Sequence, residues 1–192
     1  MTRPQRADAR RNRERLVAEA RAAFLAHGTN ASLEEVARRA GVGIGTLYRH
    51  FPRREDLLDA VFRGEVDALL DLGREAARSG DAFGALGTWL RAVVDRHRAW
   101  QAIAAATGPD RPNATLAAAR IPVEQAGKTL LARAQKAGEA HKDARIADLL
   151  RLAGAIGQAA DETPDDPKLP DRLLQLVLDG LRAQPRTGRR AR

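Results

Sequence analysis

The sequence predicts an all-α fold of about nine helices, for three reasons. Alanine, the residue that fits a helix best, occurs 39 times among 192 residues. Aromatic residues, which favour strands, make up only 4% of the chain. Apolar residues recur at helical spacing, and at 44% hydrophobic content they suffice for a buried core. The chain has no cysteine, which excludes disulfides and thiolate metal sites.

Three helices are expected in the first quarter of the chain, and each has a recognisable start or stop. Apolar residues at i, i+4 and i+8 form one face of the first helix, and a glycine ends it. A serine N-cap followed by two glutamates starts the second, and another glycine separates it from the third. A proline ends the third. The expected helices are 10–27, 33–40 and 44–51.

Longer helices are expected in the remainder, separated by glycine, proline and acidic loops. A change of phase near Ala99 predicts a kink, and Pro122 should kink its helix or mark its true start. Residues 161–170, with three prolines and four acids, form a loop, and residues 185–192 a disordered tail. The expected helices are 55–77, 82–106, 114–138, 143–160 and 171–183.

Positive charge is concentrated at both ends of the chain. The net charge of +8 divides into +6 for residues 1–55, −3 for residues 56–181 and +5 for residues 182–192. Clustered arginines gain free energy by displacing counterions from phosphates, which favours a polyanion-binding module joined to a body with another task. A basic terminus that only adds solubility is the alternative. The sequence has no apolar run that could span a bilayer and no signal peptide, so we expect a cytoplasmic protein without a membrane partner.

Residues 33–51 carry the functional prediction, because each constrained position of a helix-turn-helix holds a suitable residue. Ala37 is small where the two helices cross, Gly41 permits a positive φ in the turn, and Leu47 packs the second helix on the first. The outward face of the second helix is then short, polar and basic. An amphipathic hairpin that only packs the core is the alternative.

The segment from Ser32 to Pro52 (SLEEVARRAGVGIGTLYRHFP) resembles the DNA-binding signature of TetR-type (tetracycline-repressor-like, TetR/AcrR) transcriptional regulators. Matching spacing extends from Leu16 to Leu58, and residues 131–152 resemble the eighth-helix region of such proteins. The resemblance implies a homodimeric repressor that binds a palindromic operator in double-stranded DNA and releases it when a small-molecule effector enters the C-terminal domain. A DNA-binding regulator without such an effector, controlled by a protein partner or acting as an activator, is the alternative.

The resemblance also implies which residues contact DNA: Ser32, Ile44, Gly45, Thr46, Tyr48, Arg49, His50 and Arg54. Arg49 has the forked guanidinium that fits guanine O6 and N7, and Thr46 fits a thymine methyl or a phosphate. Ser32 can contact a phosphate or simply cap its helix. Two positions depart from the family pattern. Gly43 stands where serine or threonine is common, and Ile44, where a polar base reader is common, can reach only a methyl group or turn into the core.

Arginines ahead of the first helix are expected to form an arm that reaches an adjacent minor groove, the alternative being a flexible tail that adds only non-specific attraction. They are Arg3, Arg6, Arg10, Arg11 and Arg13. We therefore expect a helix-turn-helix domain with this arm (1–54), a helical effector-binding and dimerisation domain (55–184) and a basic tail (185–192).

Two further sets of residues are predicted in the C-terminal body. Aromatic and mixed-polarity side chains are expected to line an effector pocket, with core packing as the alternative for each: Phe62, Phe83, Trp89, Val93, His97, Trp100, Ile103, Thr107 and Val123. Apolar stripes on the last two helices are expected to form the dimer interface: Leu149, Leu152, Ala153, Ile156, Gly157, Leu173, Leu174, Val177 and Leu181.

No catalytic or cofactor motif accompanies these features, so we expect neither an enzyme nor a cofactor. The sequence contains no HExxH, Walker or nucleophile-elbow motif, and its four histidines are scattered singly. Four acids within residues 161–166 lack the order of an EF-hand, and we expect a solvated loop there rather than a metal site.

Overall fold

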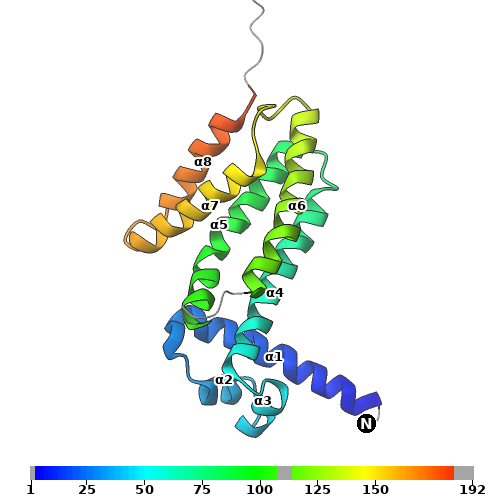
Figure 1. Ribbon diagram of the computed structural model, residues 1–192, viewed down its shortest axis with the longest axis vertical. Helices are drawn as coiled ribbons and strands as arrows, with labels where there is room; N and C mark the ends of the chain where they lie inside the picture. The colour runs from blue at the N-terminus through cyan, green and yellow to red at the C-terminus, as the bar shows by residue number, and fades with distance from the viewer. Residues whose placement is uncertain (1–2, 108–113, 184–192) are drawn as a thin grey trace, which may run out of the picture. The chain divides into compact units, whose positions relative to one another are not determined.

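The computed structural model describes residues 3–107 and 114–183, without the side chains of residues 3–6, 29, 98–99, 102–107 and 114–118. These residues form eight α-helices, one 3-10 helix and no strand, which confirms the expected all-α fold (Figure 1). The elements are α1 (Arg3–His27), η1 (Gly28–Asn30), α2 (Leu33–Arg39), α3 (Ile44–His50), α4 (Arg54–Ala76), α5 (Ala82–Thr107), α6 (Ala114–Lys136), α7 (Ile146–Glu162) and α8 (Leu169–Leu181).

Helix α1 differs from the sequence prediction, and the bounds of α5 and α6 bear on the kinks expected there. Helix α1 begins at Arg3, so the arginines expected in an arm belong to a helix. Helix α5 continues as one helix past Ala99. Helix α6 contains Pro122, which therefore does not mark its start. A proline removes one backbone donor, but the buried Leu130 and Ala134 further along α6 anchor that helix through packing.

The chain divides into two compact units, and α4, α5 and α6 contribute to both. Unit 1 comprises Met1–Ala68 and Arg98–Arg120, and unit 2 comprises Leu69–His97 and Ile121–Arg192. The functional boundary expected after residue 54 stays a prediction. The expected tail at 185–192 lies outside the described residues.

The core of unit 1 is built from the apolar faces of its first four helices. Burying each large side chain contributes roughly 1.5–3 kcal/mol, so α1, α2 and α3 are held mainly by this core rather than by helix propensity. The side chains that are at most 2% exposed include Leu16, Ala20, Phe24, Val36, Ala37, Leu47, Phe51, Leu57 and Leu58.

The core of unit 2 surrounds Trp89, which is fully buried. Its Nε1 donates a hydrogen bond to the Leu69 carbonyl at 3.1 Å. Two glycines make room for the indole: a Cβ at Gly73 would lie 3.2 Å from Nε1, and one at Gly127 would lie 2.8 Å from Cζ3. Helices α7 and α8 pack side by side in this unit (Figure 1).

The end of α8 is tied to the loop between α6 and α7. Arg182 forms an isolated antiparallel bridge with Ala140, and the Ala183 N–H donates to the Glu139 carbonyl at 2.9 Å. The Arg182 guanidinium lies 4.4 Å from the centre of the Phe83 ring, close enough for a cation–π interaction. The Glu139 carboxylate in turn accepts the Phe83 N–H at 3.0 Å.

Candidate nucleic-acid interface

The turn between α2 and α3 fixes the direction in which α3 leaves the core. Gly41 has a φ of +68°, in the left-handed region that glycine adopts without strain. Its N–H donates to the Arg38 carbonyl at 3.1 Å, and the next N–H, of Val42, donates to the Ala37 carbonyl at 3.0 Å. These bonds close the end of α2. Leu47 is fully buried, so α3 presents its opposite face outward.

Ser32 caps the first turn of α2. Its Oγ accepts the Glu35 N–H at 3.2 Å and donates to the Glu34 carboxylate at 2.9 Å. A hydrogen bond from its own backbone N–H and the one from Ser32 hold the pKa of Glu34 below its usual range. Of the two roles open for Ser32, helix capping is the one whose geometry is present.

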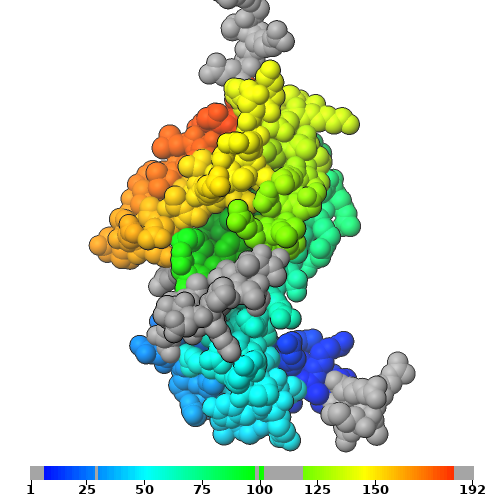
Figure 2. Space-filling model, viewed as in Figure 1, coloured from blue at the N-terminus to red at the C-terminus, as the bar shows by residue number. Residues whose placement is uncertain are grey.

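The outward face of α3 is largely uncovered (Figure 2, light blue to cyan). Ile44 is 38% exposed, so it does not turn into the core with Leu47, and a methyl contact is the remaining alternative. Gly43 at the N-cap contributes no side-chain hydrogen bond, as its missing hydroxyl predicts. The exposed and partly exposed residues of this face are Ile44, Gly45, Thr46, Tyr48, Arg49 and His50.

Arg49 is anchored along the surface of α3. Its Nη2 donates to the Thr46 Oγ1 at 2.8 Å, and its Nε donates to the Gly45 carbonyl at 3.2 Å. The guanidinium has five N–H donors in a planar fork, so several remain available to an acceptor outside the protein. The two contacts restrict the side chain before any ligand binds.

Glu35 gathers two arginines on the exposed side of α2. Its carboxylate accepts from Arg38 at 2.7 and 2.8 Å and from Arg39 at 2.9 Å. These hydrogen bonds, the one from Arg38 first, lower the pKa of Glu35 from 4.5 to about 2. The carboxylate neutralises part of the positive charge of α2, whereas the described residues place no acidic partner against Arg49.

Arg54 ties the start of α4 to the segment before α2. Its Nη1 donates to the Ala31 carbonyl at 2.7 Å, and its guanidinium lies 5.1 Å from the centre of the Phe24 ring. The sequence predicted a DNA contact at this position and gave no sign of this second, structural role. Both partners precede Arg54 by more than twenty residues, so only the fold brings them together.

Two arginines of α1 lie beside the helix-turn-helix. The Arg13 guanidinium lies 5.1 Å from the centre of the ring of Phe51, the residue that directly follows α3. An Arg15 Nη1 lies 3.5 Å from the position that a Cβ would take at Gly41, in the turn before α3. Arg15 was not among the arginines expected to reach DNA, although it belongs to the same arginine-rich run at residues 10–15.

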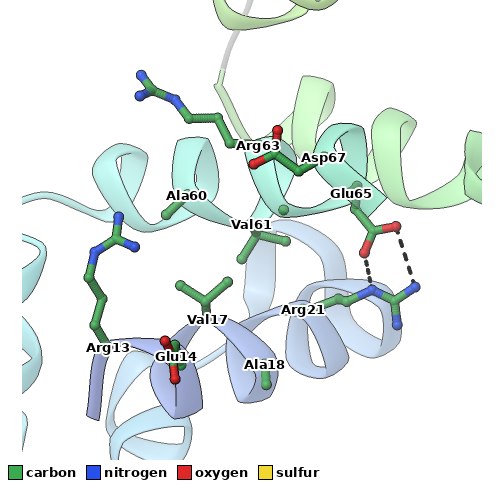
Figure 3. A pocket seen from close by; sticks show the side chains of 11 residues that line it. Arg13, Glu14, Val17, Ala18, Arg21, Ala60, Val61, Arg63, Glu65 and Asp67 are labelled. Atoms are coloured by element: carbon green, nitrogen blue, oxygen red, sulfur yellow. Dashed lines mark hydrogen bonds and ion pairs between the residues drawn. The ribbon is translucent and has the colours of Figure 1, made fainter. Parts of the chain in front are cut away.

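A groove between α1 and α4 lies in unit 1, and Arg13 is one of the residues that line it (Figure 3). Glu65, 5% exposed, is a buried carboxylate in the wall of this groove. It accepts hydrogen bonds from Arg21 of α1, drawn as dashed lines in Figure 3. Because an unpaired buried carboxylate is costly, this ion pair fixes α1 against α4.

The residues of the predicted effector pocket are distributed over both units. In unit 1 the Phe62 and Trp100 rings lie 6.2 Å apart, and the Trp100 Nε1 is buried without a hydrogen-bond partner among the described residues. In unit 2 Trp89 is a core residue with its own hydrogen bond. Phe83, Val93 and Val123 are also buried, and His97 is partly exposed. The side chains of Ile103 and Thr107 lie outside the described residues, and the pocket stays a prediction.

The residues of the predicted dimer interface fall into two groups. Six already face the core of their own chain: Leu149, Ala153, Ile156, Gly157, Leu174 and Leu181. Gly157, for example, lets α7 approach α5, because a Cβ there would lie 2.3 Å from the His97 Cβ. The other three, Leu152, Leu173 and Val177, are exposed or partly exposed. Leu176, which the sequence analysis did not assign to the interface, is 68% exposed.

A groove lies between α7, α8 and the loop before α7. Leu152, Leu176 and Val177 line it.

Among the described residues no group of three or more histidine or acidic side chains could hold a metal ion. None of the described helices is long and apolar enough to cross a membrane.

A capped α2, a left-handed glycine turn and an exposed basic α3 define a DNA-binding protein of the helix-turn-helix class. Two family models match this chain. The model of bacterial regulatory proteins of the tetR family matches residues 16–61, and that of the SbtR-like transcriptional regulator C-terminal domain matches residues 81–183. The second match alone covers more than half of the chain, and the chain belongs to the TetR family.

Similar proteins support this assignment over nearly the whole length. The TetR transcriptional regulator SCO0520 of Streptomyces coelicolor is 35% identical, with a TM-score of 0.78 over 90% of this chain and 99% of that one. A TetR regulatory protein of Mycobacterium vanbaalenii is 32% identical, with a TM-score of 0.75 over 93% and 99%. A helix-turn-helix-type transcriptional regulator of Staphylococcus aureus (strain USA300) is 38% identical over 66 residues, 34% of this chain and 36% of its own length. The match thus spans about a third of the curated relative.

Membership of this family establishes the general function. The chain is a DNA-binding transcriptional regulator and not an enzyme, as the sequence predicted.

Proposed function

We propose that the chain is a homodimeric repressor that binds a palindromic operator through α3 of each protomer and is released by a small molecule bound in the C-terminal domain. The observation that carries operator binding is the exposed face of α3, fixed by the buried Leu47 and the Gly41 turn. A helix of this kind enters the major groove. In a two-fold symmetric dimer the two copies of α3 require half-sites about one helical turn apart. Such a regulator works where bacterial DNA lies, in the cytoplasm.

Within this proposal the residues of α3 divide by role. Arg49 binds guanine O6 and N7, and Ile44 contacts a thymine methyl. Gly45 lets the helix approach the bases closely. Tyr48, His50 and Arg54 bind phosphates, which position the helix-turn-helix domain without reading sequence. Thr46 contacts DNA or holds Arg49, a distinction that a double-mutant cycle resolves.

The dimer would form through the groove between α7 and α8. Leu152 is 45% and Leu176 68% exposed, which is unusual for leucines on neighbouring helices of one domain. Burying them against a second copy would hold the two DNA-binding domains on one two-fold axis, as a palindromic operator requires.

The effector part of the proposal is supported by the fold and by the Trp100 Nε1 beside Phe62, which has no hydrogen-bond partner among the described residues. A buried N–H without an acceptor costs about 1–3 kcal/mol, which a ligand acceptor would offset. LfrR of Mycobacterium smegmatis, which shares this fold with a TM-score of 0.65 at 22% identity, has a structure in complex with proflavine.

Selection of bound duplexes from a random pool tests operator recognition. The proposal expects an inverted repeat with half-site centres about one helical turn, 10–10.5 base pairs, apart or a multiple of that. Recovery of sequences without two-fold symmetry would overturn it.

A metabolite panel read by thermal melting tests the effector. A ligand that binds only the folded state raises Tm, and the same ligand should release the selected DNA. A regulator controlled by a protein partner or acting as an activator would show neither effect.

A further inference from the structure

Helix α1 places guanidinium groups at both borders of α3. Arg13 lies over Phe51, which follows the end of α3, and Arg15 lies beside Gly41 in the turn that precedes it. Both residues are exposed. They therefore stand next to the surface that the proposed function turns toward DNA.

These two arginines differ from their neighbours on α1 in their ion pairs. Arg10 lies 3.6 Å from Glu14, and Arg11 pairs with Asp8, so each is partly neutralised. No carboxylate pairs with Arg13 or Arg15 among the described residues; Arg15 donates only to the neutral Asn12 amide. Arg13 and Arg15 thus keep their full charge beside the helix-turn-helix.

The helical form of this segment decides what part of DNA it can bind. An α-helix with its side chains is about 10–12 Å across, whereas the minor groove of B-DNA is about 6 Å wide. A segment that is helical from Arg3 onward cannot thread that groove as an extended arm does. It can lie along the outside of the duplex and present its side chains to phosphates.

We propose that α1 is a second DNA-contacting element, in which Arg13 and Arg15 bind backbone phosphates on either side of the base-reading edge of α3. This inference rests on α3 being the DNA-facing helix. The contacts carry no sequence information, so they contribute equally to operator and non-specific binding. They take the place of the minor-groove arm that the arginine run suggested.

The test is the salt dependence of DNA binding by the purified full chain. Each phosphate contact contributes about 0.9 to the slope of log K against log salt. Arg13→Gln and Arg15→Gln should each lower the magnitude of that slope by about 1 and weaken a selected operator and a random-sequence duplex by the same factor. Arg13→Lys and Arg15→Lys keep the charge and should keep most of the slope, and melting curves confirm that each variant is folded.

Arg63→Gln is the matched control. Arg63 is an exposed arginine of the same unit that points away from α1 (Figure 3), so its loss removes one charge and should leave the slope unchanged. A wild-type slope in both glutamine variants would overturn the proposal. A loss of affinity confined to the operator would also overturn it, as would a loss that depends on A·T pairs flanking the half-site. Either result would mean that these arginines contact bases.

Arg49→Ala, measured in parallel, separates this inference from the proposed function. If Arg49→Ala weakens operator preference and the α1 variants behave as wild type, only the role of α1 is wrong. If Arg49→Ala also has no effect, α3 is not the DNA-facing helix and both fail.

Discussion

At the scale of single residues, the contact between Thr46 and Arg49 changes the meaning of both. From the sequence each was an independent candidate for a base contact. The hydrogen bond between them, at 2.8 Å, means that Thr46 restricts the guanidinium that would bind guanine. A side chain ordered before binding loses less conformational entropy on the DNA.

A double-mutant cycle tests this coupling. Arg49→Ala should cost about 1–3 kcal/mol on the selected operator and relax one base position. Thr46→Ala should lose part of that affinity in wild type and almost none in the Arg49→Ala background, because its effect passes through Arg49. Thr46→Ser, which keeps the hydroxyl, serves as control. Fully additive losses, measured by titration of labelled operator, would show that Thr46 contacts DNA by itself.

Glu35 gives a pH-dependent prediction. Its pKa is about 2 in the folded chain, against an ordinary 4.5, because Arg38 and Arg39 bond the charged form. The stability this provides is complete above about pH 4.5 and is lost as the pH falls toward 2.

Glu35→Gln should therefore lower the free energy of unfolding at neutral pH, and the difference from wild type should shrink as the pH falls below about 4.5. Denaturant titrations at several pH values measure it. Glu75→Gln, at an exposed glutamate without an ion pair among the described residues, should leave the free energy of unfolding at neutral pH unchanged. Since the carboxylate is exposed, added salt should weaken the effect, and a difference insensitive to both pH and salt would contradict it.

At the scale of helices, the sequence predicted those bounds that depend on local signals. The bounds of α2 and α3 follow from Ser32, Gly41 and Pro52, which act on their own neighbourhood. The sequence could not show that Arg54 bonds Ala31 or that Arg13 lies over Phe51, because those partners meet only after folding. For Pro122 the local signal left two alternatives, a kinked helix or a helix start, and only the packed fold shows that α6 continues through it.

Gly127 tests the packing between helices in unit 2. A Cβ there would lie 2.6 Å from Ile146 Cγ1 and 2.8 Å from Trp89 Cζ3, and both side chains are buried. Gly127→Ala should therefore destabilise the chain by about 1–3 kcal/mol, despite the better helix propensity of alanine.

Gly64→Ala is the matched control, because a Cβ at Gly64 meets nothing within 4 Å. It should be neutral or stabilise by up to about 1 kcal/mol. Equal free energies of unfolding for the two variants, from chemical denaturation, would mean that α6 does not approach Trp89 so closely.

At the scale of the whole molecule, the sequence located an apolar surface on the last two helices but not its orientation. A stripe of leucines on a helix faces either its own core or a partner, and periodicity alone does not distinguish them. The fold turns Leu149, Ile156 and Leu174 inward and leaves Leu152 and Leu176 outward. The aromatic residues were ambiguous in the same way, and Trp89 belongs to the core.

Leu176→Glu should separate the protomers. A carboxylate in an apolar interface is costly to bury, so sedimentation should shift toward the monomer and operator affinity should fall, while a lone chain keeps its helical spectrum. Ile121→Glu, at an isoleucine of α6 that is 76% exposed, is the matched control and should sediment as wild type. A Leu176→Glu variant that sediments as wild type and binds the operator normally would place the contact between copies elsewhere.

The tie between the end of α8 and the loop after α6 governs how the arginine-rich terminus can be studied by deletion. A deletion that includes Arg182 would remove the residue that bridges Ala140 and the guanidinium that lies over the Phe83 ring. Any weakening of DNA binding would then mix lost charge with a loosened scaffold. A cut placed after Ala183 spares these contacts, so a change in affinity in that shortened chain does not come from their loss.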